Sequence, residues 1–325
     1  MPPPSLTLSF NPPGPALAIS SDAVMPDTTV TANVGLAGPL APPAQFVWKI
    51  TLIYNGIVCP HAVGRTTSHP PINVTTATNS LRIPFTAVRG GTLSVTVTTQ
   101  VAGAPASATA TLQINGTNPT LGALQAATLG APDLFKKLMR LESGLRQFLS
   151  PACPLFSGDN LGGVGLCQIT PAINDDQIWS WKQNLQDGLA LWAEKRRIAA
   201  AYPNHVRQSP EFSAQVAAYN AQRMARPANP PLRPISITVP DYTPDQLDLD
   251  TVRGFNGFAA GVHEYRLLTD ANGILVVTVD PAGATGVAQW QQISPAERTA
   301  IYDQLNVTRR GDVNYVADVQ RQASF

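Results

Sequence analysis

The sequence predicts two domains: an all-β domain over residues 1–118 and a mainly helical domain over residues 133–325, joined by a linker at 119–132. The chain has 325 residues, about twice the length of a typical domain. It has 22 lysines and arginines and 21 aspartates and glutamates, yet the first 130 residues contain only six of these and no glutamate. The spacing of apolar residues also changes there, from a period of two to a helical period.

The first domain is expected to be an immunoglobulin-like sandwich of antiparallel strands. Five segments combine β-branched and aromatic residues with period-two alternation, and clusters of proline, glycine and asparagine separate them. These segments are 28–34, 46–54, 80–85, 92–99 and 107–114. Asn55-Gly56 follows the second segment and predicts a tight hairpin turn, because both central positions of such a turn favour positive φ. Short strands with frequent turns are typical of a sandwich, and Trp48 is expected in its core.

Helices dominate the second domain. Asp133 is suited to cap a helix that presents four leucines on one face. These are Leu134, Leu138, Leu141 and Leu145. A long helix is expected from about residue 175 to 200, and another after Ser209-Pro210.

The rest of the second domain is interrupted by a connector and a hairpin. Residues 227–244 carry six prolines and predict a connector. Residues 265–268 and 274–279 flank Asp270-Ala-Asn-Gly273, which predicts an inserted β-hairpin. Two short helices, near residues 295 and 312, are expected to close the chain.

Composition excludes several classes of function. A net charge of +1 argues against binding driven by charge to nucleic acid or to an anionic membrane. No apolar run approaches the roughly 20 residues needed to span a bilayer, and no membrane insertion is expected. The four histidines are not spaced as a metal set, so neither a metal nor a cofactor is predicted.

Cys153 and Cys167 bracket a glycine-rich segment and are interpreted as a disulfide or as two reduced thiols.

One acid stands out among the five glutamates. Four of them are expected at the surface, but Glu142 has Leu138, Met139 and Leu145 at helical spacing. Burial there would favour the neutral carboxyl, which is what a general acid needs to protonate a glycosidic oxygen. The alternative is an ion pair with Arg146 along an exposed helix edge.

The next segment passes from a glycine-rich turn into an apolar stretch. The apolar part of residues 158–170 contains one embedded amide, Gln168, which can donate hydrogen bonds to a sugar and accept them. Glycine allows the backbone to approach a ligand closely. The segment lacks the Lys-Ser/Thr ending of a phosphate-binding P-loop.

Several motifs in order resemble those of soluble lytic transglycosylases and goose-type lysozymes. They are Glu142-Ser143-Gly144, Gly163-Val-Gly-Leu-Cys-Gln-Ile-Thr170, Ile178-Trp-Ser-Trp-Lys-Gln-Asn184, Phe255-Asn256-Gly257 and Asn314-Tyr315-Val316. Cysteine stands where methionine is usual in the second motif, and phenylalanine replaces tyrosine in the fourth. The resemblance covers roughly residues 130–325 and implies a lysozyme-like fold.

That resemblance implies cleavage of the β-1,4 bond from N-acetylmuramic acid to N-acetylglucosamine in the peptidoglycan glycan strand. Glu142 would be the catalytic acid and base of a lytic transglycosylase that forms 1,6-anhydro products. The implied substrate-binding residues are Gln168, Thr170, Phe255, Asn256 and Tyr315. A non-catalytic module that binds peptidoglycan remains an alternative.

A hydrolase is the other enzymatic alternative. An inverting hydrolase needs a second carboxylate roughly 6.5–9.5 Å from the acid to activate water. Asp159 is the candidate, since goose-type lysozymes resemble this chain in carrying an aspartate in a Gly-Asp turn. A second acidic position of those enzymes corresponds to Thr170 here. The interpretation of Asp159 as an ordinary turn residue stays open.

The whole arrangement resembles peptidoglycan-targeting effectors of contractile injection systems and phages. The N-terminus has no basic or apolar signal segment, so synthesis in the bacterial cytoplasm without a signal peptide is expected. Action would follow in the periplasm or cell wall. A component of a delivery machine and an immunity protein are the partners that this resemblance implies.

Overall fold

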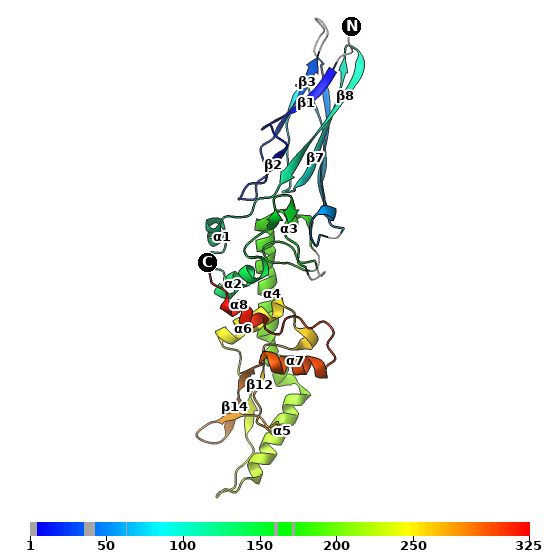
Figure 1. Ribbon diagram of the computed structural model, residues 1–325. Coiled ribbons are helices and arrows are strands. Elements are labelled where there is room, and N and C mark those ends of the chain that lie inside the picture. Colours follow the sequence, from blue (N-terminus) through cyan, green and yellow to red (C-terminus); the bar gives the residue numbers. More distant parts are fainter. Residues whose placement is uncertain (1–4, 36–42, 63, 159–161, 171–172) are drawn as a thin grey trace. The chain divides into compact units, whose positions relative to one another are not determined.

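The computed structural model describes the chain except residues 1–4, 36–42, 63, 159–161 and 171–172 (Figure 1). The protein is a mixed α/β protein with several sheets, and its contacts divide it into two compact units. The first unit comprises Met1–Ala131, Glu142–Gly188 and Phe325, and the second comprises Pro132–Leu141 and Leu189–Ser324. Residues 142–188, expected within the helical domain, therefore group with the N-terminal strands. Each unit is described by itself.

In the described part of the first unit, eight strands from the N-terminal region form two sheets. They are β1 (Ser5–Asn11), β2 (Ala16–Ala18), β3 (Thr29–Gly35), β4 (Phe46–Asn55), β5 (Thr66–Thr76), β6 (Ser80–Arg82), β7 (Gly91–Val101) and β8 (Ala104–Asn115). One sheet has the order β1-β3-β6 and the other the order β2-β8-β7-β4-β5. The two sheets share one core, in which Val30, Trp48 and Val95 are fully buried. The alternating apolar side chains of each strand supply this core.

All five predicted strands occur, as β3, β4, β6, β7 and β8, and the core position of Trp48 is confirmed. The prediction of a tight hairpin turn at Asn55-Gly56 is wrong. The Asn55 side chain instead accepts a hydrogen bond from the Ile57 amide and caps a 3₁₀ helix, η1 (Gly56–Val58). The connection to β5 therefore extends to Arg65, whose carbonyl accepts a hydrogen bond from the Gly56 amide.

Phe148, Phe156, Val164, Ile178 and Trp179, from the described part of residues 142–188, join the core of these two sheets. This segment contains β9 (Phe148–Ser150), β10 (Cys153–Pro154), and α3 (Asp175–Trp179). Trp179 is fully buried in that core, and its indole N–H donates to Thr67 Oγ1 of β5. The Arg89 guanidinium, also buried, pairs with Asp176 of α3. A short helix in the expected linker, α1 (Leu121–Ala127), completes the unit.

Helices supply most of the remaining chain. They are α2 (Asp133–Ser143), α4 (Trp181–Gln208), α5 (Pro210–Ala225), α6 (Pro244–Phe255), α7 (Pro295–Gln304) and α8 (Tyr315–Arg321). The single helix predicted from residue 175 to 200 is broken at Ser180, whose backbone is extended. The Ser180 hydroxyl accepts a hydrogen bond from the Gln183 amide, so this serine caps the start of α4.

The strands of the second unit pair differently from the expected hairpin. They are β11 (Ser236–Thr238), β12 (Tyr265–Leu267), β13 (Val277–Val279), β14 (Thr285–Ala288) and β15 (Trp290–Gln292), and a 3₁₀ helix, η2 (Ala259–Gly261), precedes β12. β12 pairs with β15 and β13 with β14, while a single bridge from Thr269 to Leu275 spans the expected hairpin. A second turn follows β13, in which the Asp280 carboxylate accepts a hydrogen bond from the Thr285 amide. This turn leads into β14, which pairs antiparallel with β13. The proline-rich connector also contains β11, which runs parallel to β14.

Candidate functional site

The candidate residues fall on both units. Glu142, Gln168 and Thr170 belong to the first, whereas Phe255, Asn256 and Tyr315 belong to the second. Asp159 lies outside the described residues.

Glu142 lies at the C-terminal end of α2 and is half-buried. The helix ends at Ser143 because the two following residues, Gly144 and Leu145, adopt positive φ angles of 59° and 64°. Leu145 and Arg146 therefore lie beyond the helix, and their predicted helical spacing from Glu142 is wrong. The apolar environment on the preceding turn does form, since Leu138 and Met139 are fully buried.

A buried hydrogen bond joins the end of α2 to the glycine-rich turn. The Ser143 hydroxyl donates to the carbonyl oxygen of Leu166 at 2.8 Å and accepts from the Leu145 amide. Ser143 directly follows Glu142, and Leu166 directly precedes Cys167, so the bond connects the neighbours of these two residues. Burial raises the pKa of the Cys167 thiol, and the Glu142 carboxylate raises it further. The acid is therefore close to the turn.

Glycine lets side chains lie directly on this turn. A Cβ atom on Gly163 would lie 3.1 Å from Gln168 Oε1, and one on Gly165 would lie 2.5 Å from the Gln147 amide. Gln168 has a positive φ of 47°, and its side-chain amide donates to the Gly165 carbonyl at 2.8 Å. This hydrogen bond holds the Gln168 side chain on the turn. Gln168 and Thr170 are both half-buried.

Gln147, which was not predicted from the sequence, holds the turn by hydrogen bonds. It is fully buried, and its Oε1 accepts a hydrogen bond from the Leu166 amide at 3.1 Å. Its Nε2 donates to the carbonyls of Gln177 and Ile178 in α3.

Asn184 also holds the turn by hydrogen bonds. The Cys167 amide donates to its Oδ1 at 2.8 Å, and its Nδ2 donates to the Val164 carbonyl at 2.8 Å. Asn184 is fully buried near the start of α4. Neither burial is visible in the local sequence, because Asn184 is flanked by Lys182, Gln183 and Gln186, and Gln147 follows Arg146. Once buried, both amides require hydrogen-bond partners.

The cysteines pair differently from either interpretation of the sequence. Cys153 forms a disulfide with Cys59, while Cys167 is a buried free thiol. The bond connects the β4–β5 connection to β10, across 94 residues of sequence.

The second-unit candidates surround the end of α6. The Phe255 ring packs against the rings of Phe135 and Trp192, with centroids 6.4 and 6.1 Å away. Asn256 caps α6, and a Cβ atom on Gly311 would lie 2.3 Å from its Oδ1. Tyr315 begins α8 and is buried.

A buried charge network holds the loop that precedes Tyr315. The Arg253 guanidinium donates to the carbonyls of Asp312 and Val313 and, at 3.0 Å, to the Glu264 carboxylate. Arg298 donates to the same carboxylate at 2.8 Å. Glu264 was expected at the surface, but it is only 3% exposed, because two guanidinium groups compensate its charge.

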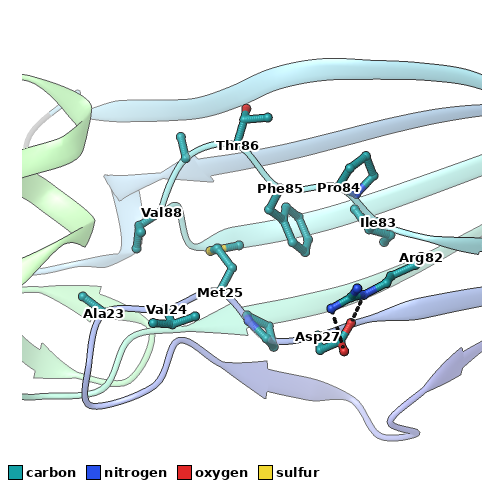
Figure 2. A pocket seen from close by; sticks show the side chains of 12 residues that line it. Ala23, Val24, Met25, Asp27, Arg82, Ile83, Pro84, Phe85, Thr86 and Val88 are labelled. Carbon is teal, nitrogen blue, oxygen red and sulfur yellow. Dashed lines mark hydrogen bonds and ion pairs between the residues drawn. The ribbon is translucent and has the colours of Figure 1, made fainter.

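A groove of about 590 Å³ lies elsewhere in the first unit, between the segments 23–27 and 82–88. Figure 2 shows Met25 and Phe85 between these segments, with the Asp27–Arg82 ion pair at one end. Both members of the pair are largely exposed. The groove offers apolar surface, and none of the candidate residues lines it.

Within the described ranges, no helix combines the length and apolarity required for a membrane span. Those same residues contain no group of three or more histidine, cysteine, aspartate or glutamate side chains arranged to hold a metal. Comparisons with protein-family models, curated proteins and solved structures return no match.

Proposed function

We propose that this protein cleaves the β-1,4 bond between N-acetylmuramic acid and N-acetylglucosamine in peptidoglycan, with Glu142 as the acid. The observation that carries the proposal is the hydrogen bond from Ser143 to Leu166. It joins a helix that ends in Glu-Ser to a glycine-rich turn that carries Gln168, and the resemblance to lytic transglycosylases implies these two motifs in this order along the chain.

The proposed reaction needs one carboxyl group acting twice. Glu142 protonates the glycosidic oxygen as the bond to the muramoyl C1 breaks. The resulting carboxylate then accepts the proton of the muramoyl 6-hydroxyl as that oxygen bonds to C1. The product is a 1,6-anhydro sugar, no water is consumed, and Glu142 regains its proton.

Gln168 is the proposed positioning group of the first unit. Its Nε2 is fixed to the Gly165 carbonyl, so the rest of the amide is held in one orientation for sugar hydroxyl or acetamido groups. Thr170, two residues further along the same unit, is the other proposed substrate contact. The roles of Phe255, Asn256 and Tyr315 stay predictions from the resemblance.

The finer fold assignment belongs to the same proposal. We infer an immunoglobulin-like sandwich from the order β1-β3-β6 in one sheet and β8-β7-β4-β5 in the other, which corresponds to strands A-B-E and G-F-C-C′. We infer a lysozyme-like arrangement for the α2 end and the glycine-rich turn from the motifs that they carry.

A bacteriolytic effector that acts in the periplasm or cell wall is the proposed setting. The Cys59–Cys153 disulfide supports it, because such bonds persist in oxidising compartments. A delivery component and an immunity protein are the corresponding proposed partners.

Glu142→Gln tests the proposal, since the amide has nearly the shape of the acid but cannot donate its proton. Glu194→Gln is the matched control, because Glu194 is an exposed glutamate on α4. Purified sacculi should clear with wild type and with the control, and should stay turbid with Glu142→Gln, while circular dichroism shows all three folded. Unchanged clearing by Glu142→Gln would end the proposal, and a wild type that binds sacculi without clearing them would favour the non-catalytic module.

A further inference from the structure

The described residues of the β4–β5 connection are held by hydrogen bonds and a disulfide. The Gly56 amide donates to the Arg65 carbonyl and the Arg65 amide to the Ala62 carbonyl, both at 2.8 Å. Ala62 is fully buried, and Cys59 is bonded to Cys153. The loop is therefore fixed both to its own strands and to β10.

This loop lies against the glycine-rich turn. A Cβ atom on Gly162 would lie 2.7 Å from Nη2 of Arg65, so the guanidinium packs directly on the glycine backbone. The Gln168 amide packs on the next residue, Gly163, where a Cβ atom would lie 3.1 Å from Gln168 Oε1. His61 of the loop lies against Gly158, where a Cβ atom would be 3.4 Å from the imidazole. Arg65 and the Gln168 amide thus pack on two successive glycines, Gly162 and Gly163.

Arg65 differs from the other arginines of the β-sheet segment in its partners. Arg82 pairs with Asp27, and Arg89 pairs with Asp175 and Asp176. For Arg65, no carboxylate of the described residues lies within ion-pair distance. The residue is half-buried and brings a guanidinium group to the turn, in a segment that has very few charged residues.

We propose that Arg65 forms a subsite for a carboxylate of the peptide-substituted muramoyl residue. This inference rests on the proposed function for the identity of the glycan. A guanidinium is planar and binds a carboxylate through two parallel hydrogen bonds. Muramoyl residues carry a lactyl group and a stem peptide with carboxylates, whereas polymers of N-acetylglucosamine alone have none. Arg65 therefore selects the acidic wall polymer over a neutral glycan of the same backbone.

The test compares two probes on the full chain, with Glu142→Gln present to prevent turnover. One probe is a tetrasaccharide from sacculi that retains its stem peptides, and the other is chitotetraose. Arg65→Gln should weaken binding of the peptide-bearing tetrasaccharide about tenfold, the usual effect of losing one charge-assisted contact, and leave chitotetraose binding unchanged. Arg65→Lys should restore part of the loss, and higher salt should reduce the difference between the probes.

Lys49→Gln is the matched control, because Lys49 is an exposed cation in mid-β4 and its removal changes net charge equally. The subsite is refuted if Arg65→Gln leaves the ratio of the two affinities unchanged, if both probes weaken together, or if Lys49→Gln has the same effect. These results are separate from sacculus clearing by wild type and Glu142→Gln, so the cleavage proposal and the subsite fail independently. Thermal unfolding of each variant confirms that the fold is retained.

Discussion

The Ser143 hydroxyl donates a 2.8 Å hydrogen bond to the carbonyl oxygen of Leu166, 23 residues further along the chain. Both residues are buried, so the contact joins the end of α2 to the glycine-rich turn away from solvent. In the proposed reaction it sets the position of Glu142 relative to Gln168.

Ser143→Ala should therefore affect both stability and activity. Loss of the bond leaves a buried carbonyl without its donor, and we expect the free energy of unfolding to fall by about 1–3 kcal/mol. The rate of sacculus clearing should fall as well, because the acid loses its fixed position. Urea unfolding and turbidity measure the two effects. Ser213→Ala, at an exposed position on α5, should change neither, and equal behaviour of the two variants would contradict the positioning role.

Asn184→Ala should destabilise the glycine-rich turn. The substitution removes partners of the Cys167 amide and of the Val164 and Gln177 carbonyls, all in buried surroundings. A loss of about 2–4 kcal/mol in unfolding free energy is expected. Asn204→Ala, at an exposed position of the same helix, is the control. A loss below the error of the urea midpoint for Asn184→Ala would show that water or a rearranged side chain replaces these bonds.

The disulfide and the free thiol give a paired prediction. Cys59→Ala should lower the unfolding free energy by about 2–4 kcal/mol, because Cys59 and Cys153 close a long loop in the unfolded chain. Cys167 should not react with a thiol reagent in the native protein, since burial raises its pKa and keeps it protonated. Thiol titration should count no reactive group in native wild type and one after denaturation. A reactive native thiol would place Cys167 at the surface instead.

Tyr54 predicts how stability changes in alkali. Burial raises the pKa of Tyr54 to about 12 from its ordinary value of 10.0. As pH rises through this interval, the unfolded chain releases the proton first, so stability present below pH 10 is lost toward pH 12. Tyr54→Phe should make the decline shallower between these pH values, measured by urea unfolding at each pH. It should cost little at pH 7, because no described residue hydrogen-bonds the buried hydroxyl oxygen. Parallel curves for the two proteins would contradict the burial effect.

Local pattern was enough to find most strands and helices, because the β-branched alternation of β4 and β7 and the caps at Ser209 and Ser294 are encoded by adjacent residues. β5 escaped prediction because His69, Pro70 and Pro71 interrupt its pattern, although the strand forms at a sheet edge where proline is tolerated.

Features that depend on distant partners were not predictable in this way. The pairing of Cys59 with Cys153 and the burial of Glu264 between two arginines are set by tertiary contacts. The end of α2 illustrates the mixed case. Its Glu-Ser ending was visible in the sequence, but the positive φ of Leu145, which moves Arg146 off the helix, was not.

The central claim is that Glu142 drives cleavage of the glycan strand, and mass spectrometry of the soluble products tests it most directly. Wild type should release muropeptides with 1,6-anhydro ends, one water lighter than the corresponding reducing sugars, and Glu142→Gln should release none. Products with reducing ends would contradict the transglycosylase route and favour a hydrolase that uses Asp159. The same anhydro products from Glu142→Gln would contradict the claim itself.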